Sequence, residues 1–383
     1  MEFELLQEVR VLSGPGCAEK IGALMRSLGS PRALVVTDPG LVAAGIAARV
    51  TDSLDKAGVP WALFDSVQPD PPARLIEDGY DRYRADGCGA VIAVGGGSAI
   101  DTAKGINILA YNPGPILAYR DFSRPMKRTA NLVAVPTTAG TGSEMSDGLV
   151  ITAPDGGKAP ILAVNGMVNY AVLDPELTLG MPAFLTAATG MDAFAHAAEA
   201  YTSKAATALT DVVCMGAMET VREWLPKAVK DGRDVQARAM MQAASTAGGW
   251  MLRYGHTHAG HSVAHVLGAR LHMPHGLACA LALPWVLEYN APALPQKTRA
   301  IGVALGAAIA RDEAPDQIGR KTRDALMRFV HETLGLPRAA QFAPSPDEYD
   351  SLAGEIAEEM FQAFNPRLMD QTAARRLLKN LFA

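Results

Sequence analysis

The sequence predicts an α/β fold: an N-terminal domain with a doubly wound, mostly parallel sheet, followed by an all-helical C-terminal domain. In the first half, short apolar runs rich in β-branched residues alternate with amphipathic helical patterns. Strands separated by helices need crossover connections, which are typical of parallel sheets. After Pro182 the chain consists of long runs rich in alanine, methionine and leucine, without a strand pattern. We therefore expect two domains in the 383 residues, at 1–182 and 183–383.

The apolar runs of the first half predict four strands, at residues 32–38, 61–67, 89–98 and 131–138. Helical patterns at 41–58 and 73–87 connect the first three. In the second half, one helix is expected to carry the segment GMDAFAHAAEAY. Another should carry HSVAH and end at VLG, residues 266–268, and a further helix should begin near His275.

Composition excludes several classes of protein. The net charge is −5 and the basic residues are scattered, which argues against binding to nucleic acid or an anionic membrane. The N-terminus carries acidic residues where a signal peptide needs positive charge, and Pro284 interrupts the most apolar window. The four cysteines lack CxxC spacing, which excludes a zinc–cysteine site and a disulfide framework. We expect a soluble cytoplasmic protein.

Three glycines, Gly95 to Gly97, lie between a predicted buried strand and a helix that begins near Ser98. Glycine lets the backbone approach a ligand closely, and the first turn of a helix offers free N–H groups to a phosphate. The segment fits neither G-x-G-x-x-G nor the P-loop pattern. A phosphate site and a tight turn without a ligand both remain open from this triplet alone.

A second turn, VPTTAGTGSE at 135–144, also follows an apolar strand and favours a ligand site. Its hydroxyl groups suit a ribose or phosphate at the carboxyl end of a sheet. Asp38, directly after the first predicted strand, is suited to accept hydrogen bonds from an adenosine ribose. Its charge would repel a 2′-phosphate and so favour NAD over NADP. The alternative is an Asp-Pro-Gly turn residue without a ligand.

Six of the eight histidines lie between His256 and His275. Asp192 and His196 are four residues apart on a predicted helix, and His261 and His265 repeat that spacing, so each pair shares a helix face. With His275, Asp192, His196 and His261 form a mixed oxygen and nitrogen set suited to Fe²⁺ or Zn²⁺. His265 is a fifth ligand or a proton-handling neighbour. No partner spacing selects His256, His258 or His272.

Four motifs, GGGSAIDTAK, PTTAGTGSE, GMDAFAHAAEAY and HSVAHVLG…MPHG, occur in order between residues 32 and 289, and FNPR follows at 364–367. Together they resemble the iron-containing (group III) alcohol dehydrogenases. The resemblance implies a Rossmann-like dinucleotide-binding domain and a helical domain in a dehydroquinate synthase-like architecture, with the active site in the cleft. It implies a metal bound by Asp192, His196, His261 and His275, with His265 beside the metal.

The resemblance also implies a cofactor site. The pyrophosphate would lie on the glycine turn, the hydroxyl turn would contact the nicotinamide side, and Lys158 would reach a ribose. Asp70 and Gly148 stand where many members have asparagine, and His256 and His258 occupy positions that are usually small or apolar, near the presumed substrate side. The expected cofactor residues are Asp38, Asp70, Gly95, Gly96, Gly97, Ser98, Asp101, Thr137, Thr138, Thr141, Lys158, Leu177 and Met181.

The implied reaction is hydride transfer between NAD and a primary alcohol whose hydroxyl the metal polarises, with His265 relaying the alcohol proton. One alternative is a reductase of an acidic carbonyl such as maleylacetate or a semialdehyde, with His256, His258, Arg253 and Arg270 near a carboxylate. A second is a sugar-phosphate cyclase, which should need a dense basic cluster. A third is a non-enzymatic metal-buffering or NAD-sensing protein. A homo-oligomer, by default a dimer, is expected.

Overall fold

The computed structural model describes residues 4–29 and 32–383. Residues 1–3 and 30–31, which belong to the predicted N-terminal domain, lie outside the described residues. The chain divides into two compact units, Met1–Gly180 and Met181–Ala383. Among the described residues, we find no helix with the length and apolar character that crossing a membrane requires.

The N-terminal unit contains a six-stranded parallel sheet in the order β1-β8-β5-β4-β2-β3, which confirms the predicted fold class. The predicted strands are β2 (Ala33–Val36), β3 (Trp61–Phe64), β4 (Ala90–Gly95) and β5 (Leu132–Pro136). Every residue of β2, β4 and β5 is buried, which explains why these strands are continuous apolar runs. Two strands that were not predicted, β1 (Arg10–Ser13) and β8 (Tyr170–Leu173), extend the sheet beside β5.

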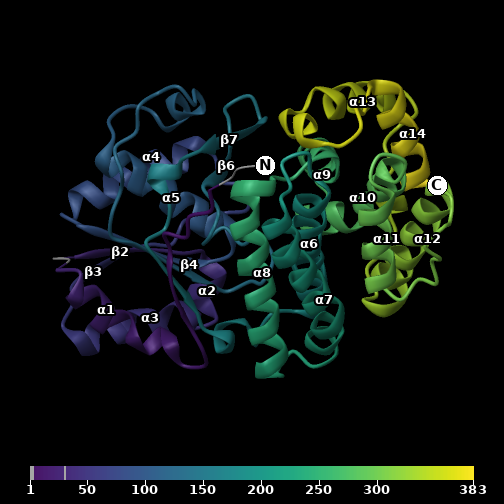
Figure 1. Ribbon diagram of the computed structural model, residues 1–383. Helices are drawn as coiled ribbons and strands as arrows, with labels where there is room; N and C mark the ends of the chain where they lie inside the picture. Colours follow the sequence, from purple (N-terminus) through teal and green to yellow (C-terminus); the bar gives the residue numbers. More distant parts are fainter. Residues whose placement is uncertain (1–3, 30–31) are drawn as a thin grey trace. The chain divides into compact units, whose positions relative to one another are not determined.

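Helices cover both faces of this sheet (Figure 1). On one face lie α1 (Ile21–Ser27) and α3 (Ile46–Ala57), and on the other α4 (Ala73–Ala85) and α5 (Gly97–Tyr111). The core between the sheet, α1 and α3 includes Ile21, Met25 and Leu54 packed with strand residues such as Ile92. The described residues of this unit also form short 3₁₀ helices: η1 (Cys17–Lys20), η2 (Ile116–Arg120), η3 (Val164–Gly166) and η4 (Pro175–Thr178).

Two details of the N-terminal unit differ from the sequence prediction. The single helix expected at 41–58 is divided into α2 (Pro39–Ala43) and α3, because Gly45 adopts a left-handed conformation with φ 72°. The second is an antiparallel hairpin of β6 (Gly148–Thr152) and β7 (Lys158–Leu162), separate from the main sheet.

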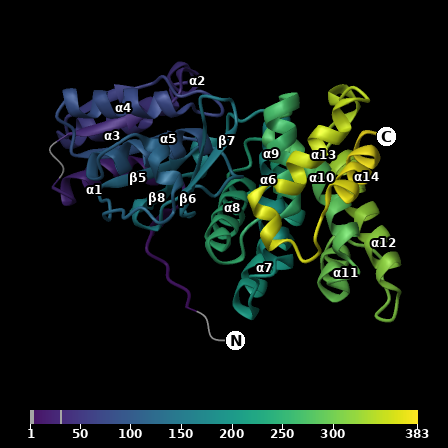
Figure 2. The same ribbon diagram turned by 90° about the horizontal axis from the view of Figure 1, so that it is seen from above.

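The C-terminal unit is helical throughout its described length, as predicted. Helix α6 packs against α7, α8 and α10, and α10 also packs against α9 (Figure 2). The α-helices are α6 (Ala183–Thr202), α7 (Ala208–Lys230), α8 (Val235–Gly255), α9 (Ala259–Leu271), α10 (His275–Asn290), α11 (Pro295–Ala304), α12 (Pro315–Arg328), α13 (Glu348–Glu358) and α14 (Gln371–Phe382). The shorter turns are η5 (Phe329–Thr333), η6 (Ala339–Phe342) and η7 (Met360–Phe364).

Helix α9 continues three residues past the predicted end at Gly268. It ends where His272 adopts a left-handed conformation, with φ 53°. A left-handed residue after the last helical residue is a common way to end a helix, so His272 has a backbone role here.

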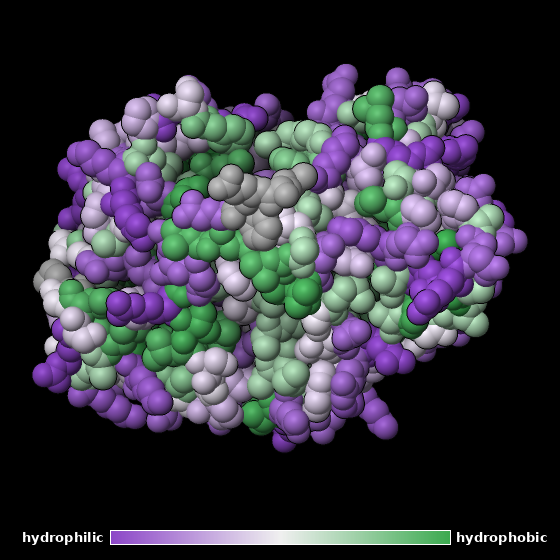
Figure 3. Space-filling view, in the orientation of Figure 1, coloured by the Kyte–Doolittle hydropathy of each residue, from purple (hydrophilic) through white to green (hydrophobic). Residues whose placement is uncertain are grey.

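The molecular face in Figure 3 shows hydrophilic residues over much of its area, with hydrophobic residues gathered in separate patches. Some large apolar side chains are strongly exposed, including Val212 and Leu368, at 71% and 80%. Single exposed apolar residues are normal for a globular protein and define no binding surface by themselves.

Candidate metal centre and dinucleotide turn

Three helices of the C-terminal unit bring the four predicted metal ligands together. Asp192 and His196 lie one turn apart on α6, His261 lies on α9, and His275 is the first residue of α10. The next residue, Gly276, explains the close approach of α10 to α6. A Cβ atom there would lie 2.3 Å from the carbonyl oxygen of Ala188.

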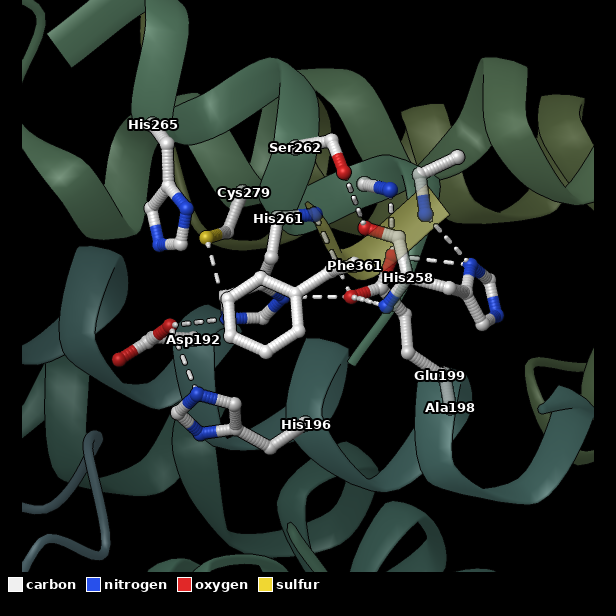
Figure 4. A network of polar contacts seen from close by, with 12 residues as sticks. Asp192, His196, Ala198, Glu199, His258, His261, Ser262, His265, Cys279 and Phe361 are labelled. Carbon is white, nitrogen blue, oxygen red and sulfur yellow. Dashed lines mark hydrogen bonds and ion pairs between the residues drawn. The ribbon is translucent and has the colours of Figure 1, made fainter. Parts of the chain in front are cut away.

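The four side chains converge on one carboxylate oxygen (Figure 4). Asp192 Oδ1 lies 3.7 Å from His196 Nε2, 3.5 Å from His261 Nε2 and 3.6 Å from His275 Nε2. The side chains of Asp192, His196 and His261 are 3%, 6% and 4% exposed, whereas that of His275 is 43% exposed. The centre is therefore buried on the side of α6 and α9 and accessible beside His275.

These distances fit an ion held between the side chains better than direct hydrogen bonds. Asp192 Oδ1 is buried and has no hydrogen-bond partner among the described residues, although buried polar oxygens are almost always paired. Two ligand atoms bound tetrahedrally to one ion at about 2.1 Å lie about 3.4 Å apart. The observed separations are slightly longer than this value, so the residues present fit a divalent metal ion.

The charge state of Asp192 also suits a cation. Burial raises the pKa of this carboxyl, but the neighbouring imidazoles, His196 first and then His275 and His261, hold it well below its usual range. Asp192 is therefore ionised at neutral pH and supplies one negative charge at the centre.

Glu199, which the sequence interpretation missed, orients His261. Its carboxylate is fully buried and accepts a hydrogen bond from His261 Nδ1 at 2.5 Å. It also accepts from three backbone N–H groups, those of His258, Gly260 and His261. Burial raises the pKa of Glu199, but these partners lower it to about 2. A hydrogen bond from Nδ1 leaves the Nε2 lone pair of His261 free to bind a metal ion.

Two sequence features account for this contact. Glu199 follows Asp192 by seven residues and His196 by three, so all three share a face of α6. That spacing could have revealed it. Gly260 is required because a Cβ atom there would lie 2.3 Å from Glu199 Oε1.

His258 does not have the expected place near a substrate, because it is completely buried. Its Nδ1 accepts the N–H of Ala259, and its Nε2 lies 2.9 Å from Thr202 Oγ1. The threonine hydroxyl donates to the carbonyl of Ala198, so it must accept from His258 Nε2–H. His258 is thus neutral and caps α9, and burial lowers its pKa accordingly.

His256 also has a structural explanation. It ends α8 with φ 59° and ψ 165°, a backbone conformation that normally requires glycine. Its ring stacks on Phe364, with the ring centroids 4.0 Å apart.

His265 lies beside the candidate ligands without pointing its Nδ1 at them. Its Nδ1 is 3.1 Å from Glu359 Oε1, and its ring stacks on His275 with centroids 5.7 Å apart. Glu359 also accepts hydrogen bonds from the Ser262 hydroxyl and the Phe361 N–H. Burial raises the pKa of Glu359, but His265 and these donors lower it overall. Glu359 comes from a distant segment, and no sequence spacing pointed to it.

In the N-terminal unit, the two predicted cofactor turns pack against each other. A Cβ atom on Gly96 would lie 3.1 Å from Thr138 Oγ1, and one on Gly97 would lie 2.8 Å from Thr141 Cγ2. The N–H of Thr137 donates to the carbonyl of Gly95. Both turns follow the carboxyl ends of neighbouring strands, β4 and β5, where ligands of open α/β sheets bind.

The remaining predicted cofactor residues have varied surroundings. Asp70 and Lys158 form an ion pair, and Asp38 Oδ1 caps α2 by accepting the Leu41 N–H. Both oxygens of Asp101 accept hydrogen bonds within the unit, from the Ser143 hydroxyl and the Val150 N–H. The neighbouring buried Lys104 donates to the carbonyl oxygens of Ser146 and Gly148.

The two expected nicotinamide contacts have different surroundings. Leu177 is only 2% exposed and belongs to the hydrophobic core around α1 and α3, so its side chain is not available to line a ligand pocket. Met181 lies in the C-terminal unit, where its carbonyl oxygen accepts a hydrogen bond from Arg238.

Comparisons with known proteins agree with this architecture over nearly the whole chain. Residues 8–175 match the family model described as iron-containing alcohol dehydrogenase, and residues 186–382 match that of the Fe-containing alcohol dehydrogenase family, C-terminal. A 1,3-propanediol dehydrogenase of Klebsiella pneumoniae is 38% identical over 373 residues, with 96% of each chain covered. An NAD-dependent methanol dehydrogenase of Bacillus methanolicus is 33% identical over 369 residues, again with 96% of each chain covered. A crystal structure of a 1,3-propanediol oxidoreductase matches with a TM-score of 0.93 at 32% identity and covers 100% of both chains.

The relatives and the candidate metal centre together indicate an oxidoreductase that interconverts an alcohol and its carbonyl compound. The chain belongs to the iron-containing alcohol dehydrogenase family. The relatives do not favour the two alternative activities considered from the sequence, reduction of an acidic carbonyl compound and cyclisation of a sugar phosphate.

Proposed function

We propose that Asp192, His196, His261 and His275 hold one Fe²⁺ ion and that the enzyme oxidises a small primary alcohol with NAD. The observation that carries this proposal is the buried Asp192 Oδ1, which has no hydrogen-bond partner among the described residues and has three imidazole nitrogens 3.5–3.7 Å away. Imidazole and carboxylate ligands suit Fe²⁺ and also accept Zn²⁺. The similarity to dehydrogenases of methanol and 1,3-propanediol supports a small alcohol as substrate.

For the cofactor, we propose that the pyrophosphate binds at Gly96, Gly97 and Ser98, in the first turn of α5. The N-terminus of this 15-residue helix offers free N–H groups and a partial positive charge. Asp38 follows β2, and its charge would disfavour the 2′-phosphate of NADP. The NAD dependence named for the Bacillus methanolicus relative supports the same cofactor.

When bound, the metal ion would polarise the substrate oxygen, and NAD would accept the hydride. Asp192 is the only carboxylate among the four proposed ligands, and the other three would bind through imidazole nitrogens. Glu199 holds the His261 ring in one orientation, which keeps its Nε2 directed at the centre. The open side at His275 gives a substrate access.

We further propose that His265 Nε2 receives the proton of the alcohol hydroxyl. Its Nδ1 faces Glu359, whose carboxylate would stabilise the protonated imidazole. The side chain is 13% exposed, so the proton can pass on to solvent.

Replacement of His265 by alanine is expected to lower kcat at least about tenfold, since positioned proton transfer commonly contributes more than this. The measurement is kcat for alcohol oxidation as a function of pH, with His331→Ala as a control in the same unit. His331 donates from Nδ1 to the nearby carbonyl of Leu336, and its loss should leave kcat unchanged. Full turnover with an unchanged pH profile in His265→Ala would refute the role.

Replacement of Gly97 by alanine is expected to raise the KM for NAD at least about tenfold, because the turn needs close backbone approach to the pyrophosphate. The new methyl group would also press on Thr141, 2.8 Å away. The control is Gly216→Ala, at an exposed position of α7, where a Cβ atom meets nothing within 4 Å. Unchanged NAD affinity in Gly97→Ala, measured by fluorescence titration, would argue against this phosphate site.

The proposed function is tested by supplying NAD or NADP with a panel of primary alcohols of increasing length, diols and hydroxy acids. We expect NADH formation with small uncharged alcohols and a lower kcat/KM with NADP. Saturable NAD binding without turnover on any alcohol, or on any aldehyde with NADH, would overturn the proposal.

A further inference from the structure

The candidate metal centre has a fifth donor that the family pattern does not include. Cys279 lies on α10, one turn after His275, and is only 1% exposed. Its Sγ lies 3.7 Å from His261 Nε2 and 3.7 Å from His275 Nε2. Figure 4 shows the sulfur atom pointing toward the His261 ring, on the side of His265. The absence of CxxC spacing led the sequence interpretation to exclude a cysteine ligand, although a four-residue spacing from His275 was present.

The position of the sulfur fits metal coordination. Its two imidazole neighbours lie at equal distances from it, as expected for donors around one ion. For a tetrahedral ion with a sulfur bond of about 2.3 Å and a nitrogen bond of about 2.1 Å, the sulfur and nitrogen lie about 3.6 Å apart. Both observed distances are within about 0.1 Å of this value.

The oxygen atom of the centre gives independent support. Donor atoms of Asp192, His261, His275 and Cys279 all lie within 4.8 Å of one another. Asp192 Oδ1 is buried and lacks a hydrogen-bond partner among the described residues, so it too needs a positively charged partner, which a metal ion would supply.

We propose that Cys279 is an additional metal ligand, whose thiolate binds the same ion as Asp192, His261 and His275 and shifts the preference of the site toward thiophilic ions such as Zn²⁺. This inference rests on the proposed metal centre. On binding, a sulfur–metal bond replaces the S–H bond, and the thiol proton passes to solvent. His196 stays in the ligand set, as proposed above.

The test is anaerobic loading of metal-free protein with Co²⁺, a spectroscopic substitute for Zn²⁺ or Fe²⁺, followed by absorption spectroscopy. The wild type should show a thiolate-to-cobalt charge-transfer band in the near ultraviolet. Cys279→Ala and the volume-conserving Cys279→Ser should lose this band and keep the visible bands of cobalt bound to histidine and carboxylate. The control is Cys214→Ala, which removes a buried cysteine on α7 and should behave as the wild type.

The same variants should differ in Zn²⁺ affinity. Removal of the thiol is expected to raise the Zn²⁺ dissociation constant at least about tenfold, the range seen when supporting groups of a metal site are removed. If the wild type bound one equivalent of cobalt without a charge-transfer band, coordination by the thiol would be refuted, while the metal centre itself would be supported. Wild-type protein that binds no cobalt would overturn the metal centre itself, and the thiol ligand with it.

Discussion

Replacement of Asp192 by asparagine is expected to remove the bound metal ion and to lower kcat/KM for alcohol oxidation at least about a thousandfold. Loss of metal polarisation of the substrate oxygen costs several kcal/mol of transition-state stabilisation, and about 4 kcal/mol corresponds to this factor. Asparagine has nearly the same shape, so the effect isolates the charge of the only carboxylate in the proposed set. The measurements are metal content by elemental analysis and steady-state kinetics.

A matched control for this change is Asp316→Asn, at an exposed position in the first turn of α12. It makes the same chemical change far from the centre in sequence and should leave metal content and kinetics unaltered. If Asp192→Asn kept a full equivalent of metal and wild-type turnover, Asp192 would not be a ligand.

Replacement of Glu199 by alanine is expected to lower the free energy of unfolding by about 3–5 kcal/mol, as found when one partner of a buried ion pair is removed. The substitution leaves three buried backbone N–H groups and His261 Nδ1 without their acceptor. The measurement is denaturant unfolding of the metal-free protein at neutral pH. Metal affinity should fall about 10- to 100-fold in the same variant, because His261 loses its orientation.

The effect of Glu199 should depend on pH in a defined direction. Its pKa is lowered from 4.5 to about 2 in the folded protein, so its stabilisation is fully present above 4.5. That stabilisation is lost as the pH falls toward 2, and the difference between wild type and variant should shrink with it. Glu199→Gln keeps the side-chain volume and an acceptor oxygen. It should therefore unfold at a higher denaturant concentration than Glu199→Ala. Equal stability of wild type and Glu199→Ala at neutral pH would contradict the role of this carboxylate.

The sequence predicted four adjacent strands of the sheet, β2 to β5, and missed β8 and β1 beside them. The fully buried strands β2, β4 and β5 are unbroken apolar runs, and these patterns are specific. The edge strand β1 is largely exposed and only four residues long, so its pattern is weak. The hairpin of β6 and β7 alternates between buried and half-buried residues around a turn at Gly156 and Gly157, a signal that was present and not used.

At the metal centre, local spacing predicted single helix faces but not which faces meet. Asp192 with His196, and His261 with His265, follow from the period of the α-helix. That α6, α9 and α10 converge is a tertiary property, and so is the approach of Glu359 to His265 across more than ninety residues of sequence. The histidine-rich segment also misled, because fully buried His258 caps a helix and has no open side toward a substrate.

Dependence of alcohol oxidation on a bound metal ion is tested most directly by a metal titration of the apoprotein. The apoprotein is prepared with a chelator under anaerobic conditions, and the readout is the rate of NADH formation from a primary alcohol. The four-ligand centre predicts no activity without metal, a linear rise with added Fe²⁺ up to one equivalent per chain, and a plateau beyond it. The same titration of Asp192→Asn should stay at the baseline. If the metal-free protein formed NADH at the wild-type rate, or if the rate did not respond to added metal, the reaction would not depend on a metal ion at this centre.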